Sequence, residues 1–482
     1  MPGSKFIGRK AELEQLARLL EKKSSSLIVI RGRRRIGKTT LIQHFAELNQ
    51  LKLATITGLP LTPETTADMQ RKEFAEQLCS QFNLPAVATS EWSELFRHLN
   101  RAVSNQPIVV LLDEISWMGS EEPDFLGKLK NAWDNEFKKN SNLILVLCGS
   151  VSSWIEKNIL SSTGFLGRLS RQFDLKQLSL QECYQFWQEA PGVVAPYEIF
   201  KVLAITGGIP RYLEEILPHR SAEQNIQMLC FEPEGFLVSE FERIFTDALM
   251  HRSPKYRLIV RQLCEQALSA DSLLDTNGEH RGGTLSSYLD DLELAGFITR
   301  DFTWNFKTEK ASKFSQYRLS DNYSRFYLKY IEPNKSAILN GDFRDRSLSA
   351  LPAWSTVLGL QFENLVIANR HLLYEAMGLK KEEIIASGPF FQRATKRKKG
   401  CQIDLLIQTQ FGTLYPIEIK FSKHPVTTAI LTEMKRKVDN LALPRHISIR
   451  PVLVHVNGVD EAVQESKNFA HIIDFGSLLS KP

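Results

Sequence analysis

Two glycines and a lysine near the N-terminus have the spacing of a phosphate-binding loop. Residues 32–40 are Gly-Arg-Arg-Arg-Ile-Gly-Lys-Thr-Thr, which fits G-x-x-x-x-G-K-[ST]. The glycines let several backbone N–H groups point inward, and the N-terminus of a following helix adds partial positive charge. Lys38 would then reach the β- and γ-phosphates of a triphosphate, and the Thr39 hydroxyl would ligate Mg²⁺. The predicted loop residues are Gly32, Arg33, Arg34, Arg35, Ile36, Gly37, Lys38, Thr39 and Thr40.

The residues around this loop supply the strand and the helix that such a site needs. Residues 27–31 (Leu-Ile-Val-Ile-Arg) are a short apolar run typical of a buried strand, and residues 41–45 open an apolar-periodic helix. The alternative is a glycine-rich turn beside a basic surface patch. The strand-loop-helix context favours the nucleotide site.

Two carboxylates end a second apolar run, residues 108–114 (Ile-Val-Val-Leu-Leu-Asp-Glu). A continuously apolar strand belongs inside a parallel sheet, and ligands of open α/β sheets collect at the carboxyl ends of the strands. Asp113 is therefore a candidate to hold Mg²⁺, and Glu114 to polarise the water that attacks the γ-phosphate. Alone, the pair could instead start a loop or cap a helix. A third apolar strand, residues 143–148, leads to Ser150, whose hydroxyl could contact the γ-phosphate or the attacking water.

A third group of charged residues lies near the other end of the chain. Residues 403–407 and 416–421 form two expected strands around a turn at 410–412. Period two puts Glu418 and Lys420 on one face, and a hairpin symmetric about Phe411 makes Asp404 face Glu418 directly. Directly paired residues have Cβ atoms about 5 Å apart, a separation at which two carboxylates can share one divalent cation but repel each other without one. The pattern predicts either a metal site or an unfavourable clash, and the alternative is an exposed hairpin with alternating charges.

The elements between these groups alternate as strands and helices, which indicates an α/β fold. Residues 285–319 give a helix, a glycine turn, a strand, a basic loop and a second strand, the order of a winged helix-turn-helix. Asp290, Asp291 and Glu293 are expected to be exposed on that helix and would repel a phosphate backbone. We therefore favour a packing or relay role over base reading. The basic loop between the two strands, with Lys307, Lys310 and Lys313, keeps a nonspecific contact with nucleic acid as an alternative. Residues 332–334 and 341–342 are expected to be a linker.

Bulk properties restrict the class of protein. The chain has 482 residues, 43% of them hydrophobic, which suggests about three soluble globular domains. Six scattered cysteines without ligand spacing predict reduced thiols and no zinc site. No apolar run is long enough for a membrane, so we expect a cytoplasmic protein. A net charge of +5 is too small to indicate a polyanion partner, so that argument rests on the basic runs at 393–399 and 435–437.

Several of these motifs together resemble the archaeal-type ATPases of the AAA+/STAND group. In chain order they are residues 6–9 (Phe-Ile-Gly-Arg), the arginine-rich loop, 111–114, 148–150, 167–168 and 207–210. The resemblance implies a sheet of order 5-1-4-3-2 and a helical lid over the nucleotide. It makes Arg211 a possible sensor of the phosphates. Arg168 becomes a candidate to donate charge to the γ-phosphate, in its own subunit or from a neighbour, although a surface arginine is the slightly favoured alternative.

The C-terminal hairpin resembles the PD-(D/E)xK nuclease-like fold, which some members of the archaeal-type ATPase family carry. The resemblance implies that Asp404, Glu418 and the Ile419 carbonyl hold Mg²⁺ or Mn²⁺, that Lys420 orients a water molecule, and that Glu363 adds a ligand or a supporting contact. The chain departs from the strict motif because Ile403, not proline, precedes Asp404.

We therefore expect a parallel-sheet P-loop ATPase core over residues 1–178, a helical lid over 179–235, a winged-helix module over 236–335 and a nuclease-like α/β domain over 336–482. The expected activity is ATP hydrolysis with Mg²⁺, coupled to action on nucleic acid, DNA more than RNA. The resemblance is compatible with a homo-oligomer. The alternative is a nucleotide-dependent regulator whose C-terminal domains bind a partner and cut nothing.

Overall fold

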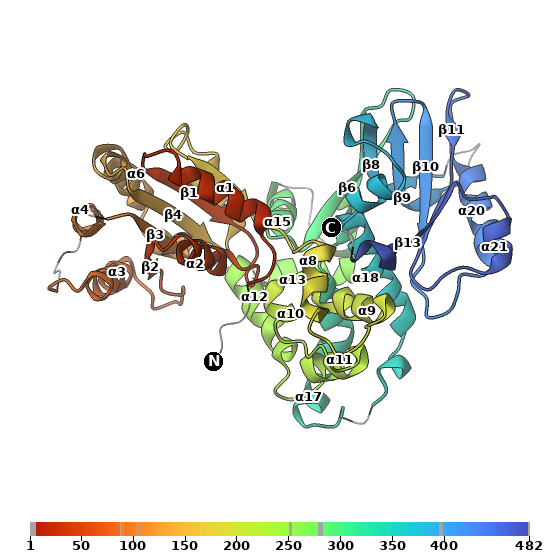
Figure 1. Ribbon diagram of the computed structural model, residues 1–482, viewed down its shortest axis with the longest axis horizontal. Coiled ribbons are helices and arrows are strands. Elements are labelled where there is room, and N and C mark those ends of the chain that lie inside the picture. The colour runs from red at the N-terminus through yellow and green to blue at the C-terminus, as the bar shows by residue number, and fades with distance from the viewer. Residues whose placement is uncertain are drawn as a thin grey trace. The chain divides into compact units, whose positions relative to one another are not determined.

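The computed structural model describes residues 6–86, 89, 91–103, 106–249, 253–277, 283–344, 346–394 and 399–480. The chain divides into two compact units (Figure 1). Unit 1 comprises residues 1–177, 242–253 and 287–296, and unit 2 comprises residues 178–241, 254–286 and 297–482. No helix among the described residues is both long and apolar enough to cross a membrane.

Unit 1 is built on a five-stranded parallel sheet. Its order, β2-β3-β4-β1-β5, is the predicted order 5-1-4-3-2 counted from the other edge. The strands are β1 (Ser26–Arg31), β2 (Lys52–Thr57), β3 (Ile108–Asp113), β4 (Leu143–Gly149) and β5 (Arg171–Asp174). The helices are α1 (Lys10–Leu20), α2 (Lys38–Leu48), α3 (Ala67–Phe82), α4 (Trp92–Val103), α5 (Ile115–Met118), α6 (Phe125–Asn135) and α7 (Ser152–Ile155).

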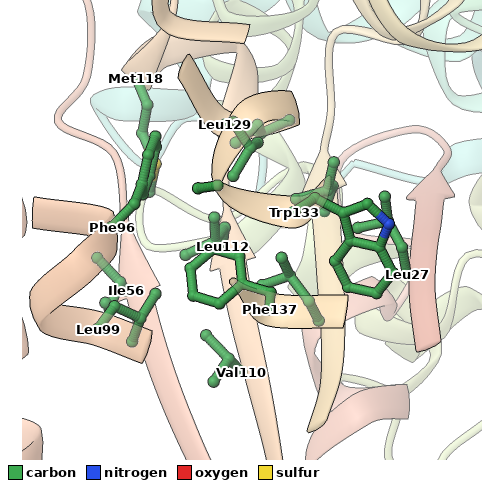
Figure 2. Packing of buried hydrophobic residues seen from close by; sticks show 14 of the residues in the cluster. Leu27, Ile56, Phe96, Leu99, Val110, Leu112, Met118, Leu129, Trp133 and Phe137 are labelled. Carbon is green, nitrogen blue, oxygen red and sulfur yellow. The ribbon is translucent and has the colours of Figure 1, made fainter. Parts of the chain in front are cut away.

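Burial explains why these segments form strands and helices. Strands β3 and β4 are buried along their whole length, as expected for strands inside a parallel sheet. Helix α4 places an apolar stripe, Trp92, Leu95, Phe96, Leu99 and Val103, in the same core. Figure 2 shows side chains of α4, α6 and the sheet meeting in this core.

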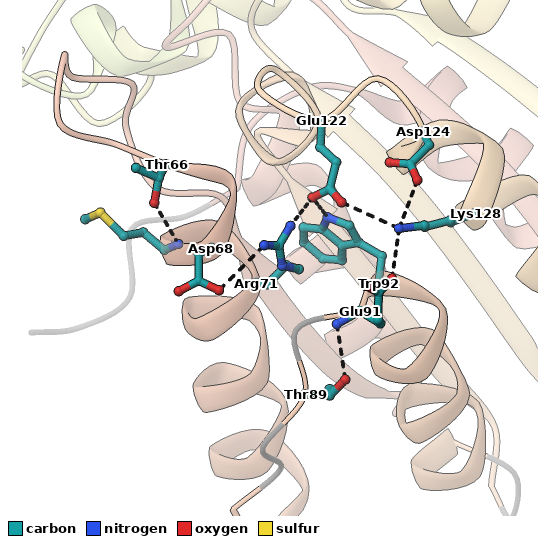
Figure 3. A network of polar contacts seen from close by, with 10 residues as sticks. Thr66, Asp68, Arg71, Thr89, Glu91, Trp92, Glu122, Asp124 and Lys128 are labelled. Carbon is teal, nitrogen blue, oxygen red and sulfur yellow. Dashed lines mark hydrogen bonds and ion pairs between the residues drawn. The ribbon is translucent and has the colours of Figure 1, made fainter.

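A polar network ties the helices of unit 1 together beside that core (Figure 3). Glu122 accepts a 2.7 Å hydrogen bond from the Trp92 indole and forms an ion pair with Arg71. Lys128 contacts Glu122 as well, and also pairs with Asp124 at 2.9 Å and Glu91 at 3.1 Å. The network therefore links α3, the start of α4 and α6.

Unit 2 contains a mixed sheet and most of the remaining helices. The sheet has the order β13-β12-β10-β9-β8, with β11 beside β10, and a separate hairpin pairs β6 with β7. The strands are β6 (Ile298–Trp304), β7 (Ala311–Leu319), β8 (Ile384–Gln392), β9 (Cys401–Thr409), β10 (Thr413–Ile419), β11 (Ser448–Ile449), β12 (Val452–His455) and β13 (His471–Asp474). The helices are α8 (Leu180–Tyr184), α9 (Pro196–Thr206), α10 (Pro210–Leu213), α11 (Ala222–Cys230), α13 (Ser253–Glu265), α14 (Ala270–Asn277), α16 (Asn322–Phe326), α17 (Glu332–Leu339), α18 (Trp354–Ala368), α19 (His371–Ala376), α20 (Ala429–Asn440) and α21 (Glu461–Glu465). Helices α12 (Glu240–Leu249) and α15 (Gly283–Leu294) have residues in both units, and Ser253, the first residue of α13, belongs to unit 1.

Two expectations about the middle of the chain are wrong. The predicted linker at 332–334 is the start of helix α17, because a proline is tolerated in the first turn of a helix. Asp291 is not exposed: it is 7% accessible and forms an ion pair with Lys157 at 3.2 Å. The order of α15 followed by the β6–β7 hairpin is as expected, and the assignment of a winged helix stays a prediction.

Candidate functional site

The predicted phosphate loop joins the end of β1 to the start of α2. Gly32 has φ 151° and Gly37 has φ 88°, which are conformations that side chains rarely adopt. A Cβ at Gly32 would lie 2.7 Å from the Leu175 carbonyl oxygen, so a larger residue does not fit there. Lys38 donates hydrogen bonds from Nζ to the carbonyl oxygens of Gly32 (3.0 Å) and Arg33 (3.3 Å). Its ammonium is therefore held at the loop.

Both predicted Mg²⁺ ligands of the nucleotide site lie in contact. The Thr39 hydroxyl, in the first turn of α2, donates to Asp113 Oδ2 at 2.6 Å. Asp113 ends β3 and is only 8% accessible. A hydroxyl and a carboxylate beside a phosphate loop are the hard oxygen donors that Mg²⁺ prefers, so these residues fit the metal.

Glu114 and Ser150 also meet, although 36 residues separate them along the chain. Ser150 donates its hydroxyl (2.8 Å) and its backbone N–H (3.1 Å) to Glu114 Oε2. Glu114 adopts φ 50°, a conformation that costs a non-glycine residue about 1 kcal/mol or more. The fold thus holds this carboxylate in a defined place at the carboxyl end of the sheet.

Arg9 is a structural part of the loop that the sequence interpretation did not assign. Its guanidinium donates to the carbonyl oxygens of Ile36 (3.0 Å) and Lys176 (2.7 Å), and the residue is 5% accessible. Beside it, the Phe6 ring stacks on His44 of α2 at 4.0 Å between centroids. Residues 6–9 were noted in the sequence only as one motif of the family resemblance, and no role was predicted for Arg9.

Replacing Arg9 by alanine should therefore loosen the loop. Loss of two buried charged hydrogen bonds is expected to lower the free energy of unfolding by about 2 kcal/mol and to weaken MgATP binding roughly 10-fold. Denaturant unfolding and calorimetry measure the two effects, with the exposed Arg18→Ala on α1 as control. Lowered stability with unchanged nucleotide affinity would restrict Arg9 to a role in folding.

Arg168, the candidate charge donor to the γ-phosphate, and Arg211, the possible sensor, each have partners within their own unit. Arg168 forms a bidentate ion pair with Asp134 of α6, with both distances at 2.8 Å. It would have to leave this pair to reach a nucleotide, which favours the alternative of a surface arginine. Arg211 belongs to unit 2, where it pairs with Glu214 at 3.1 Å and lies over the Phe236 ring. Their roles toward a nucleotide stay predictions.

The C-terminal hairpin has the register that places Asp404 opposite Glu418. The paired residues run from Thr413 with Thr409 to Ile417 with Leu405, which is symmetric about Phe411. Asp404 Oδ2 accepts the Ile419 backbone N–H at 3.0 Å. Glu418 is almost completely buried, and burial, followed by the charge of Asp404, raises the pKa of its carboxyl.

Two lysines neutralise this carboxylate pair. Lys420 Nζ lies 2.9 Å from Glu418 Oε1 and 3.1 Å from Glu433 of α20. Lys437, also on α20, contacts Glu418 Oε2 at 2.6 Å and Asp404 Oδ1 at 3.3 Å. Burial lowers the pKa of Lys437, but the two carboxylates outweigh burial and raise it above its usual value. Sequence reasoning had placed Lys437 only in a basic run.

Glu363 lies on α18 and differs in charge from the predicted metal ligands. Its burial, followed by the charge of Asp404, raises the pKa of its carboxyl to about 8. Its surroundings in the metal-free protein thus favour the protonated form of this carboxyl. Among the residues that the structure describes, no three His, Cys, Asp or Glu side chains gather as a metal cluster. Asp404, Glu418 and a backbone carbonyl are oxygen donors that fit Mg²⁺ or Mn²⁺.

The sheet order, the glycine loop and the Thr39–Asp113 contact together define a P-loop NTPase. Residues 6–216 match the family described as an ATPase domain predominantly from Archaea. Through this segment the chain belongs to that family of archaeal ATPase domains.

The chain is also similar to individual proteins and solved structures. An uncharacterized protein of Methanocaldococcus jannaschii is 25% identical over 367 residues, which cover 75% of this chain and 76% of that protein. An uncharacterized ATP-binding protein of the same organism is 47% identical over 51 residues, 11% of this chain and 86% of that protein. Among solved structures, the Walker-type ATPase of Pyrococcus abyssi matches with a TM-score of 0.47 and 20% identity. The match covers 67% of this chain and 96% of the Pyrococcus chain. The ORC2 protein of Aeropyrum pernix has a TM-score of 0.42 and 17% identity, covering 71% and 96%.

Proposed function

We propose that the chain binds ATP with Mg²⁺ between β1 and α2, hydrolyses it, and uses the cycle to control a metal-dependent nuclease-like site in unit 2 that acts on nucleic acid. The observation that carries the ATPase part is the 2.6 Å contact between Thr39 Oγ1 and Asp113 Oδ2 beside the glycine loop. It supports the proposal because the same two oxygens serve Mg²⁺ in P-loop enzymes.

Each residue of the nucleotide site has a proposed task. Lys38 turns from the loop carbonyls to the β- and γ-phosphate oxygens, while Thr39 and Asp113 hold Mg²⁺. When bound, Mg²⁺ neutralises the charge that develops on the phosphates. Glu114 orients the attacking water and accepts its proton, and Ser150 positions the Glu114 carboxylate for this task.

In the C-terminal site, Asp404, Glu418 and the Ile419 carbonyl would hold Mg²⁺ or Mn²⁺. When bound, the metal stabilises the charge of the phosphate under attack and lowers the pKa of water. Lys420, held 2.9 Å from Glu418, orients that water. Glu363 would add a ligand or a supporting contact to this site.

A groove in unit 2 supports nucleic acid as the partner. It has a volume of about 1260 Å³ and lies between the β6–β7 hairpin, the end of β8 and the segment after α20. Its ionisable lining residues are Lys307, Arg393, Arg445, His446 and Asp439. The Arg393 guanidinium stacks over the Phe314 ring at 3.8 Å. Cations beside aromatic faces suit phosphates and bases.

Cleavage is tested with DNA and RNA in the presence of Mn²⁺ and ATP. The wild-type chain is expected to cut one of them, and Asp404→Ala to reduce the rate by at least about 100-fold, because a metal ligand is lost. Glu465→Ala, an exposed carboxylate in the same unit, serves as control. Equal cleavage by wild type and Asp404→Ala, or no cleavage by either, would count against a nuclease.

A second candidate function is a nucleotide-dependent regulator that binds a partner without cutting it. The contact of Lys437 with both Asp404 and Glu418 favours it, since a lysine can satisfy the two carboxylates without any metal. ATP hydrolysis that persists in a chain without cleavage activity or metal binding at Asp404 would support this candidate.

A further inference from the structure

We propose that Lys437 is a built-in competitor of the divalent cation: its ammonium neutralises Asp404 and Glu418 in the metal-free protein, and metal binds there only when this lysine leaves. The inference deepens the proposed metal-dependent role of this site and rests on it. It begins from the contacts of Lys437 Nζ with Glu418 Oε2 at 2.6 Å and with Asp404 Oδ1 at 3.3 Å.

Each carboxylate has one oxygen committed elsewhere. Asp404 Oδ2 accepts the Ile419 N–H at 3.0 Å, and Glu418 Oε1 contacts Lys420 at 2.9 Å. The remaining oxygens, Asp404 Oδ1 and Glu418 Oε2, are the two that Lys437 contacts. A cation shared by the pair would use those same oxygens, because the other two already have hydrogen-bonding partners.

An ammonium and a divalent cation cannot share this place. Mg²⁺ and Mn²⁺ require oxygen ligands at about 2.1 Å, and an ammonium in contact with both Asp404 Oδ1 and Glu418 Oε2 occupies the position that such an ion would take. Removing Lys437 without adding metal would leave the buried Glu418 facing the partly buried Asp404, with Lys420 paired to Glu418, which is also unfavourable. The pair therefore needs one cation or the other.

Helix α20 carries an alternative ion-pair partner for Lys437. Glu433, one turn earlier on the same helix, has Oε1 3.8 Å from Lys437 Nζ. A rotation of the lysine side chain toward Glu433 would keep its charge paired while it releases Asp404 and Glu418. The exchange therefore requires movement of a side chain and no unfolding of the helix.

The first experiment titrates Mn²⁺ into the nucleotide-free full-length chain by calorimetry. Lys437→Met, which keeps length and removes charge, is expected to bind Mn²⁺ at least 10-fold more tightly than wild type. Lys435→Met, an exposed neighbour on the same helix, should match wild type. Adding Asp404→Asn to Lys437→Met should abolish the tight binding. Equal or weaker binding by Lys437→Met, or no binding by either protein, would overturn the proposal.

The second experiment measures thermal unfolding. Lys437→Met should unfold several degrees below wild type without metal, and saturating Mn²⁺ should recover most of this loss, because a ligand that binds only the folded state stabilises it. A loss that Mn²⁺ does not recover would show that Lys437 is only structural.

A third variant keeps the test decisive if Lys437→Met does not fold. Lys437→Arg keeps the charge and can bind both carboxylates through its fork of donors, so it should weaken Mn²⁺ binding several-fold relative to wild type. Unchanged affinity in Lys437→Arg would contradict the competition. These readouts are independent of cleavage: tight Mn²⁺ binding by Lys437→Met without any nuclease activity would support the inference and reject the nuclease.

Discussion

Lys38→Ala is expected to abolish ATP binding. The lysine supplies the loop with a buried ammonium, 7% accessible, that two backbone carbonyls hold where phosphates would bind. Loss of such a charge from a desolvated contact with phosphate costs several kcal/mol, so the affinity for MgATP should fall by at least about 100-fold. Calorimetry with the purified chain measures this affinity.

The exposed Lys22→Ala, near the end of α1, is a charge-matched control and should bind ATP normally. Without nucleotide, Lys38→Ala should lower the free energy of unfolding by about 2 kcal/mol, since two buried charged hydrogen bonds are lost, and the chain should still fold. Normal MgATP affinity in Lys38→Ala would remove the phosphate loop from its proposed role and, with it, the ATPase proposal.

Glu114→Gln is expected to retain ATP binding and to lose hydrolysis. Glutamine has the same shape and can still accept the two hydrogen bonds from Ser150, so the local structure should persist. It cannot accept a proton from the attacking water, and loss of a general base costs about 100-fold to 10,000-fold in rate. Phosphate release under single-turnover conditions measures the chemical step.

Glu121→Gln, an exposed residue a few positions further along, is the matched control. It should hydrolyse ATP as the wild type does. A normal rate for Glu114→Gln would exclude this carboxylate as the base and direct attention to another group at the end of the sheet.

Local and nearly local patterns predicted much of the fold. The phosphate loop could be found because the residues that define it, two glycines, a lysine and a threonine, all lie within residues 32–40. The facing of Asp404 and Glu418 followed from hairpin geometry, in which a short turn determines which residues are opposite. The buried strands β1, β3 and β4 were recognisable from continuous apolar runs.

Errors arose where the outcome depended on distant packing. Asp291 was expected to be exposed on its helix, but Lys157, 134 residues away, pairs with it. Residues 332–334 contain a proline that could end one element or begin another, and here it begins α17. In both cases the local sequence was compatible with either outcome.

Contiguous residues thus sufficed to identify a nucleotide-binding α/β protein and a pair of facing carboxylates, because loop and hairpin geometry is encoded over a few neighbouring positions. The partners of those groups depended on how distant segments pack. Arg9 reaches the carbonyl of Lys176, 167 residues along the chain, and Lys437 turns inward to carboxylates that lie 19 and 33 residues before it. The direction of a long charged side chain depends on the charges that the fold brings near it, and no spacing within its own helix specifies them.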